Sequence, residues 1–195
     1  LSRFFLGSVV SAFLAGAVAA APFAYITNGL SDTVSVIDTP SNTVVATVPV
    51  GSGPFGVAVS PTGTRVYVAN LTSNSVSVIN TVTNSVTATV ALSGNPVGVA
   101  VNASGTRVYA TTWFSNNVSV IDTATNTVVA TVATGALPGG IAVSPNGARV
   151  YVAILGNDSE GLAKVAADFA EKVKKIPGVV DVELSVKPGL PAYAV

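Results

Sequence analysis

Four tyrosines recur at a constant interval of 42 residues, and this repeat constrains the fold more than any other feature of the 195-residue chain. They are Tyr25, Tyr67, Tyr109 and Tyr151. Other sets keep the same interval: Asp38, Asn80 and Asp122; Pro54, Pro96 and Pro138; Gly56, Gly98 and Gly140; Gly63, Gly105 and Gly147; Arg65, Arg107 and Arg149. A repeat of this length without insertions indicates a fold built from equivalent, stacked modules.

Each repeat contains four short segments that are rich in β-branched residues and separated by turn-forming clusters. The predicted strands of one period are 65–70, 75–80, 85–91 and 97–102. Segments 75–78 and 86–90 alternate large apolar residues with small or hydroxylated ones. Val57–Val59 and Val99–Val101 are apolar on both faces, which predicts buried, innermost strands, whereas the alternating strands should lie nearer the outside. Four-stranded modules of about 40 to 45 residues are typical of β-propeller blades.

The repeat resembles that of YVTN-type β-propellers, which occur in archaeal surface-layer proteins and in bacterial secreted or surface proteins. The resemblance rests on the segments Tyr67-Val68-Ala69-Asn70, Ser77-Val78-Ile79-Asn80-Thr81, Gly56-Val57-Ala58-Val59-Ser60-Pro61 and Gly63-Thr64-Arg65-Val66-Tyr67. It covers about residues 23–152. It implies a propeller fold and an exported or cell-surface protein.

The repeats give three strands, two complete sets of four, and two further strands, which makes 13 in all. Closed propellers have about four to eight blades. The repeats within 23–155 therefore predict an open arc with apolar faces at both ends, and such patches favour association. Two interpretations remain open: chains complete a ring by self-association through the open blade faces, or the sequence is a fragment of a longer repeat array.

The amino end, residues 1–22, has the pattern of a secretory signal peptide. Arg3 precedes an apolar run that continues to Val18, and small residues at Ala17 and Ala19 predict cleavage after Ala19. The alternative is a retained membrane anchor, because the run is about the minimum length for a span. Either interpretation places the protein outside the cytoplasm, as a secreted, cell-surface or periplasmic protein.

The carboxyl end, residues 156–195, differs in composition and periodicity. Eleven of the 18 charged residues fall within 158–195, which indicates a boundary near Gly156. Apolar residues at helical spacing predict a helix that ends at Pro177-Gly178, and alternation over 180–187 predicts a strand, so that the segment forms a β-α-β unit. The stretch from Lys174 to Gly189 resembles part of the periplasmic porter domain of resistance-nodulation-division efflux transporters.

Composition excludes several function classes. The formal net charge is zero, so a nucleic-acid partner is not expected. The chain has no Cys and no His, so thiolate metal sites and the commonest general base and metal ligand are absent. No catalytic constellation, metal site or cofactor is predicted, and the chain is not expected to be an enzyme.

Three groups of repeat residues are candidates for a site. Asp38, Asn80 and Asp122 each precede a turn, where their side chains are expected to bond the backbone two residues on. Arg65, Arg107 and Arg149 recur once per repeat and would either hold an acidic ligand at a rim or remain solvated, locally paired charges.

The third group is Trp113 and Phe114, which replace the Leu71-Thr72 and Gly29-Leu30 of other repeats in a loop. Loop aromatics on a rigid scaffold are suited to recognition, and the alternative is packing between blades.

The leading hypothesis from the sequence is a non-catalytic, exported or cell-surface β-propeller that presents a binding surface to a protein or cell-envelope partner. A second hypothesis is an envelope component related to the porter domain of an efflux transporter, in which residues 156–195 carry the function. A propeller hydrolase or oxidoreductase is the third and least favoured.

Overall fold

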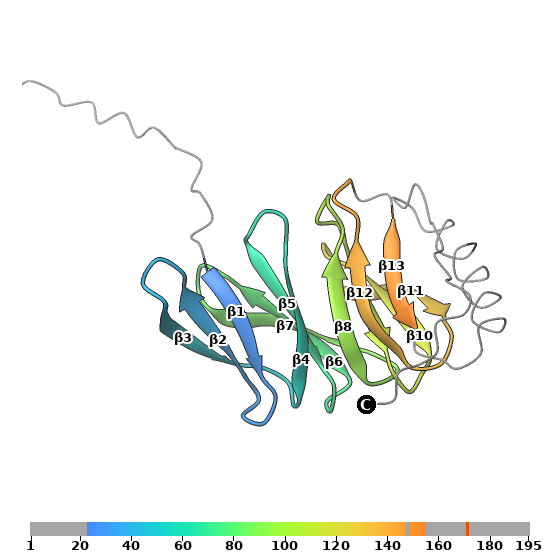
Figure 1. The fold of residues 1–195 in the computed structure, drawn as a ribbon, viewed down its shortest axis with the longest axis horizontal. Coiled ribbons are helices and arrows are strands. Elements are labelled where there is room, and N and C mark those ends of the chain that lie inside the picture. Colours follow the sequence, from blue (N-terminus) through green and yellow to red (C-terminus); the bar gives the residue numbers. More distant parts are fainter. Residues whose placement is uncertain (1–22, 147–148, 155–170, 172–195) are drawn as a thin grey trace, which may run out of the picture.

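The computed structural model describes residues 23–146, 149–154 and 171. These residues contain 13 strands in four antiparallel sheets (Figure 1). The predicted targeting segment, 1–22, and the predicted α/β segment, 156–195 apart from Glu171, lie outside the described residues. The described residues include no helix with the length and apolarity needed to span a bilayer.

The strands are grouped as three, four, four and two, which is the predicted grouping. Sheet 1 contains β1 (Phe23–Asn28), β2 (Thr33–Asp38) and β3 (Thr43–Pro49). Sheet 2 contains β4 (Pro54–Val59), β5 (Arg65–Asn70), β6 (Ser75–Asn80) and β7 (Ser85–Ala91). Sheet 3 contains β8 (Pro96–Val101), β9 (Arg107–Thr112), β10 (Asn117–Asp122) and β11 (Thr127–Ala133). Sheet 4 contains β12 (Pro138–Val143) and β13 (Val150–Ile154).

The sheets follow one another along the molecule in chain order, from β1–β3 to β12–β13 (Figure 1). The first strands of sheets 2, 3 and 4, β4, β8 and β12, contact one another in succession and form the inner edge of the assembly. The predicted strand 97–102 is observed as β8, shifted by one residue, and it begins sheet 3. Sheets 2, 3 and 4 each start at the inner edge and run outward in chain order, and sheet 1 starts with the equivalent of their second strand.

Burial does not follow the prediction that the innermost strands are the most buried. The middle strands β5 and β6 are almost wholly buried, whereas β4 is largely half-exposed and leaves Phe55 and Val59 at the surface. The middle strands are covered on both faces by the neighbouring sheets, while an inner strand borders the open inner edge. Side chains on a strand at the edge of a sheet have fewer neighbours, so β4 is less buried than β5 and β6 although its residues are apolar.

Strand β6 was also predicted to lie nearer the outside because serines alternate with valines along it. Instead Ser75 and Ser77 are buried, and both hydroxyls accept hydrogen bonds from Asn70 Nδ2 at 3.1 and 2.9 Å. Buried hydroxyl groups are tolerated when they are hydrogen-bonded. The polar partner comes from the adjacent strand β5, so the pattern within β6 alone could not show it.

The core consists of three layers, each between two consecutive sheets. A tyrosine of one sheet packs with valines of the same sheet against branched residues of the next. Tyr25 lies with Val66, Val68 and Ile79 of sheet 2. Tyr67 lies with Val108 and Ile121 of sheet 3, and Tyr109 lies with Val150 of sheet 4. The tyrosine-bearing face of each sheet is therefore turned toward the next sheet in the chain.

Glycines on the inner strands allow the sheets to come together. A Cβ added at Gly56 would lie 2.3 Å from the Val97 carbonyl oxygen, and one at Gly98 would lie 2.8 Å from the Gly139 carbonyl oxygen. No real Cβ approaches a backbone atom so closely, so only glycine fits. At the equivalent Gly140 nothing lies within 4 Å, because no further sheet follows in the described part of the chain.

Candidate binding face

Two sets of loops lie at opposite ends of the strands. One set, here called the connector face, consists of the turns β1–β2, β5–β6 and β9–β10 and of the connections between sheets. These loops are 29–32, 71–74, 113–116, 50–53, 92–95 and 134–137. The other set, the turn face, holds the remaining hairpin turns, which include 60–64, 102–106, 39–42, 81–84 and 123–126. The antiparallel register fixes this division, since Arg65 pairs with Asn80 at one end of β5 and Asn70 pairs with Ser75 at the other.

Hydrogen bonds join the six loops of the connector face into one continuous layer. The Leu71 and Trp113 amides donate to the carbonyl oxygens of Gly53 and Asn95, both at 2.8 Å. The Asn95 side chain donates to the Leu71 carbonyl oxygen at 3.0 Å, which connects the turn of sheet 2 to the next connection. Loops tied to one another in this way form a preorganised surface, which lowers the ordering cost of binding.

Asx residues at the ends of the turns hold the connections in place. Asp32, Asn74 and Asn116 have φ values of 56°, 51° and 50°, in the left-handed region that Asp and Asn tolerate. The Asp32 carboxylate accepts hydrogen bonds from the Gly53 amide at 2.8 Å and from the Ser52 hydroxyl at 3.2 Å. This carboxylate, the nearest one in sequence to Asp38, is therefore occupied by the backbone of the following connection.

Trp113 and Phe114 form a tilted aromatic pair on the connector face, with ring centroids 5.6 Å apart. Trp113 is half-buried, while Phe114 is 69% exposed. The Trp113 indole Nε1 is buried and has no hydrogen-bond partner among the described residues. A buried donor without a partner is destabilising by about 1–3 kcal/mol.

Leu137 lies in the connection next to this pair and has an unusual backbone. Its φ is 53°, which is a strained value for a side chain of this type, and its equivalent in the first connection is Gly53 with φ 66°. The Leu137 amide donates to Asn116 Oδ1 at 3.0 Å, and this bond holds the strained connection against the aromatic turn. Strained backbone that persists in a structure is found preferentially at functional sites.

Further apolar side chains are exposed at or beside the same face. Leu30 is fully exposed in the turn of sheet 1, and Phe55 is exposed where the first connection enters β4. Sequence reasoning did not single out Leu30, Phe55 or Leu137. Comparison of equivalent positions could have found two of them, because Phe55 has Val97 and Gly139 as equivalents and Leu137 has Gly53 and Asn95.

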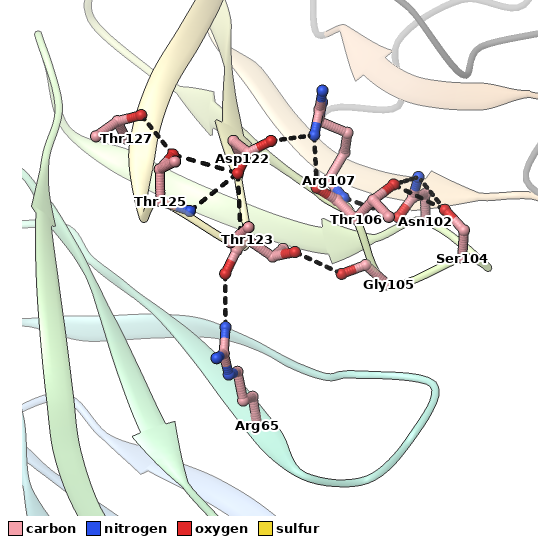
Figure 2. A network of polar contacts seen from close by, with 11 residues as sticks. Arg65, Asn102, Ser104, Gly105, Thr106, Arg107, Asp122, Thr123, Thr125 and Thr127 are labelled. Carbon is pink, nitrogen blue, oxygen red and sulfur yellow. Dashed lines mark hydrogen bonds and ion pairs between the residues drawn. The ribbon is translucent and has the colours of Figure 1, made fainter.

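The three arginines lie at the turn face, away from the aromatic pair. Figure 2 shows Arg65 Nη1 donating to the Thr123 carbonyl oxygen of sheet 3 at 2.6 Å, a contact that joins two sheets. Arg107 forms an ion pair with Asp122 of its own sheet and donates to the Thr106 carbonyl oxygen at 2.9 Å. Arg149 directly precedes β13, and its backbone forms hydrogen bonds with Ser144.

Asp38, Asn80 and Asp122 accept hydrogen bonds from the backbone of the turns that follow them. Asn80 Oδ1 accepts from the amides of Val82 and Thr83 at 2.8 and 3.1 Å. Asp122 Oδ1 accepts from the amides of Ala124 and Thr125 at 2.9 and 3.0 Å. Asp38 accepts from the amide and hydroxyl of Ser41. These side chains stabilise the turns in the manner of Asx turns.

The partners of Arg65 and Arg107 differ because the residue opposite them differs. Arg107 faces Asp122, whereas Arg65 faces the uncharged Asn80 and extends instead to the neighbouring sheet. Hydrogen bonds from the Thr125 backbone amide, and to a smaller extent the Arg107 charge, lower the pKa of the Asp122 carboxyl below its usual value. Both guanidinium groups are therefore engaged within the protein.

The described residues contain no group of three or more His, Cys, Asp or Glu side chains suited to a metal ion. The structure thus separates the predicted site residues. The aromatic pair belongs to a surface with exposed apolar loops, and Arg65, Arg107, Asp38, Asn80 and Asp122 belong to the hydrogen bonding of the opposite end. The chemistry that the connector face offers is apolar and aromatic contact, with amide and hydroxyl groups around it.

The chain is similar to solved structures of β-propeller proteins. Hydrazine synthase from Kuenenia stuttgartiensis matches with a TM-score of 0.63 and 27% sequence identity, over 65% of this chain and 37% of that chain. Dihydro-heme d1 dehydrogenase NirN in complex with DHE matches with a TM-score of 0.57 and 20% identity, over 64% of this chain and 28% of that chain. No protein-family model and no curated protein sequence matches the chain.

The chain thus spans roughly a third of the length of the structures that it matches. These similarities and the four antiparallel sheets establish an all-β fold of the β-propeller type.

Proposed function

We propose that the protein is a non-catalytic, exported or cell-surface propeller-type scaffold whose connector face binds a protein or cell-envelope partner. The observation that carries the proposal is the cluster of Trp113, Phe114 and Leu137 on adjoining loops. An aromatic pair, an unpartnered indole donor and a strained leucine coincide at one place on an otherwise regular repeat. Tryptophan is enriched among the few residues that dominate the binding energy at protein interfaces, and phenylalanine is enriched in interface cores.

The scaffold supports this role because hydrogen bonds join the loops of the connector face to one another. The turn that bears the aromatic pair is bonded to the connection before it and to the connection after it, through the Trp113 amide and Asn116 Oδ1. A surface held on both sides presents its side chains with little loss of entropy on binding. Loops on rigid sheets are the usual place for recognition.

The proposed location outside the cytoplasm rests on the sequence. The pattern of residues 1–22 favours export, and the repeat resembles the YVTN-type repeats of secreted and surface-layer propellers. The same resemblance favours a binding role over a catalytic one.

The experiment exchanges the aromatic pair for the residues that the second repeat carries at the same positions. The double variant Trp113→Leu, Phe114→Thr reproduces the Leu71-Thr72 turn and should therefore leave the fold intact. Binding of the fluorescently labelled protein to an envelope preparation from the source organism is measured by sedimentation. We expect the double variant to lose at least about tenfold in affinity, because aromatic anchors often contribute 2 kcal/mol or more.

The matched control is Val82→Thr, which removes a fully exposed apolar side chain from the turn face. It should bind as the unaltered protein does. Equal binding by the double variant and the unaltered protein would contradict the proposal, and so would an equal loss in the Val82→Thr control.

A further inference from the structure

We propose that the two terminal faces of the sheet stack bind each other between two copies of the chain, head to tail. The tail face is the side of sheet 4 turned away from sheet 3, with Gly140, Ala142, Tyr151 and Ala153. The head face is the side of sheet 1 turned away from sheet 2, with Ala24, Ile26, Ile37 and Val44. The inference does not depend on the proposed binding role of the connector face.

The orientation of the tail face follows from the core of the last layer. Ile141, Val143, Val150 and Val152 pack toward the Tyr109 face of sheet 3. The alternate residues of the same strands therefore point away from sheet 3. Tyr151 is 44% exposed, while the equivalent Tyr67 and Tyr109 are 1% and 2% exposed. Sheet 4 thus shows the surface that sheets 1, 2 and 3 each bury.

The tail face repeats the part of the buried face of sheet 2 that its first two strands, β4 and β5, supply. Sheet 2 presents Gly56, Ala58, Tyr67 and Ala69 toward sheet 3, and sheet 4 carries Gly140, Ala142, Tyr151 and Ala153 at the equivalent positions. The structure already contains this face in contact with a partner, and that partner is the next sheet of the same repeat. On these two strands the tail face therefore has the same residues that sheet 2 packs against sheet 3.

The head face supplies a surface of that kind. Ile37 and Val44 are the equivalents of Ile79 and Val86, which pack toward the tyrosine face of sheet 1. Ile26 and Val44 are 49% and 57% exposed, although the residue equivalent to Ile26 in sheet 2, Val68, is fully buried. None of the eight residues of the two faces is charged, so their contact would desolvate no ion.

The contact is heterologous, because the tail face of one copy meets the head face of the other. Heterologous contacts give closed rings or open filaments, depending on the rotation between copies. Two copies bring eight of the described sheets together, although sheets 1 and 4 have only three and two strands, and this number is within the range of about four to eight blades in closed propellers. A closed dimer is therefore the expected product.

The test uses the 195-residue chain and two variants that each place a charge on one face, Tyr151→Arg and Ile26→Arg. Mass is measured by sedimentation velocity over a wide concentration range, with circular dichroism as the check on folding. We expect the unaltered chain to form dimers and each variant alone to remain monomeric. An equimolar mixture of the variants should form a dimer again, weaker than that of the unaltered chain, because one contact joins an intact head to an intact tail while the other carries both arginines.

The control is Val82→Arg, which lies on neither face and should leave the dimer unchanged. A monomeric unaltered chain would overturn the proposal. If Tyr151→Arg then also melted at a lower temperature than the unaltered monomer, the tail face would be covered by another part of the same chain. Dimers that form equally well in both variants, or a mixture that stays monomeric, would also overturn it.

Discussion

Tyr67 and Tyr151 hold equivalent places in sheets 2 and 4, yet the first is 1% and the second 44% exposed. The residues beside them on their own and the preceding strand are the same, Ala58 and Ala142 among them. The difference comes from sheet 3, which covers Tyr67, and from β6, whose Val78 lies next to Tyr67, whereas the described sheet 4 has only two strands. In a repeat protein of this kind a residue's energetic role depends on the neighbouring sheet as much as on its own. Equivalent positions therefore serve as controls for one another.

The largest difference is expected for removal of the two tyrosines. Tyr67→Ala should destabilise the protein by about 3–5 kcal/mol, because it leaves a cavity between sheets 2 and 3. Tyr151→Ala should change the free energy of unfolding by less than about 1 kcal/mol. Urea unfolding at low protein concentration measures both values. Similar losses for the two variants would show that sheet 4 is covered as completely as sheet 2.

The glycines of the inner strands give the next contrast. A Cβ at Gly56 would meet the Val97 carbonyl oxygen at 2.3 Å, whereas a Cβ at Gly140 meets nothing within 4 Å. Gly56→Ala should therefore lower stability by about 1–3 kcal/mol through forced separation of β4 and β8. Gly140→Ala should be within about 0.5 kcal/mol of the unaltered protein. Thermal melts of the two variants check the difference, and equal melting temperatures would contradict it.

These contrasts also show which part of the structure the sequence determines. Residues that recur at equivalent positions, such as Tyr67 and Tyr109, predicted the strands and their grouping into sheets. The burial of Ser77 could not be predicted, because its partner Asn70 belongs to another strand. The positive φ of Leu137 could not be predicted from a leucine, and only comparison with the equivalent Gly53 would have indicated it.

The candidate site could be predicted only in part, because the sequence shows departures from the repeat but not contacts between sheets. Trp113 and Phe114 break the repeat, so they were visible in the sequence. The arginines were also predicted as binding candidates. The sequence does not show that they would contact the neighbouring sheet at the end of the strands opposite to the aromatic pair. The contact between Arg65 and Thr123 joins residues of two sheets, and it appears only once the sheets are stacked.

A smaller effect is expected for the hydroxyl groups that join consecutive sheets. Thr111 Oγ1 donates to the Gly139 carbonyl oxygen at 2.7 Å and accepts from the Gly98 amide at 2.9 Å, and Thr111 is fully buried. Thr27 makes the equivalent bond to the Phe55 carbonyl oxygen at 2.8 Å at a more exposed place. Thr111→Ala should cost about 1–3 kcal/mol, because buried backbone groups lose their partner.

Thr27→Ala should have the smaller effect, about 0.5–1 kcal/mol, since water can replace the hydroxyl there. Chemical denaturation of both variants measures the pair. A greater loss for Thr27→Ala would mean that the edge of sheet 1 is more deeply covered than sheet 3.

The smallest effect concerns the acid dependence of the turn face. The pKa of Asp122 is lowered in the folded protein, first by the Thr125 amide and also by Arg107. A lowered pKa adds stability above the ordinary pKa of an aspartate, about 3.9, and that stability is lost as the pH falls through the lowered value. Asp122→Asn should therefore lower the melting temperature at neutral pH by a small amount, and the difference from the unaltered protein should shrink in acid.

The reverse exchange in sheet 2, Asn80→Asp, places a carboxylate opposite Arg65 and should add an acid-dependent contribution of the same sign. Melting curves recorded from neutral to strongly acidic pH test both, and a constant difference at all pH values would show that the carboxylate acts there only by its shape.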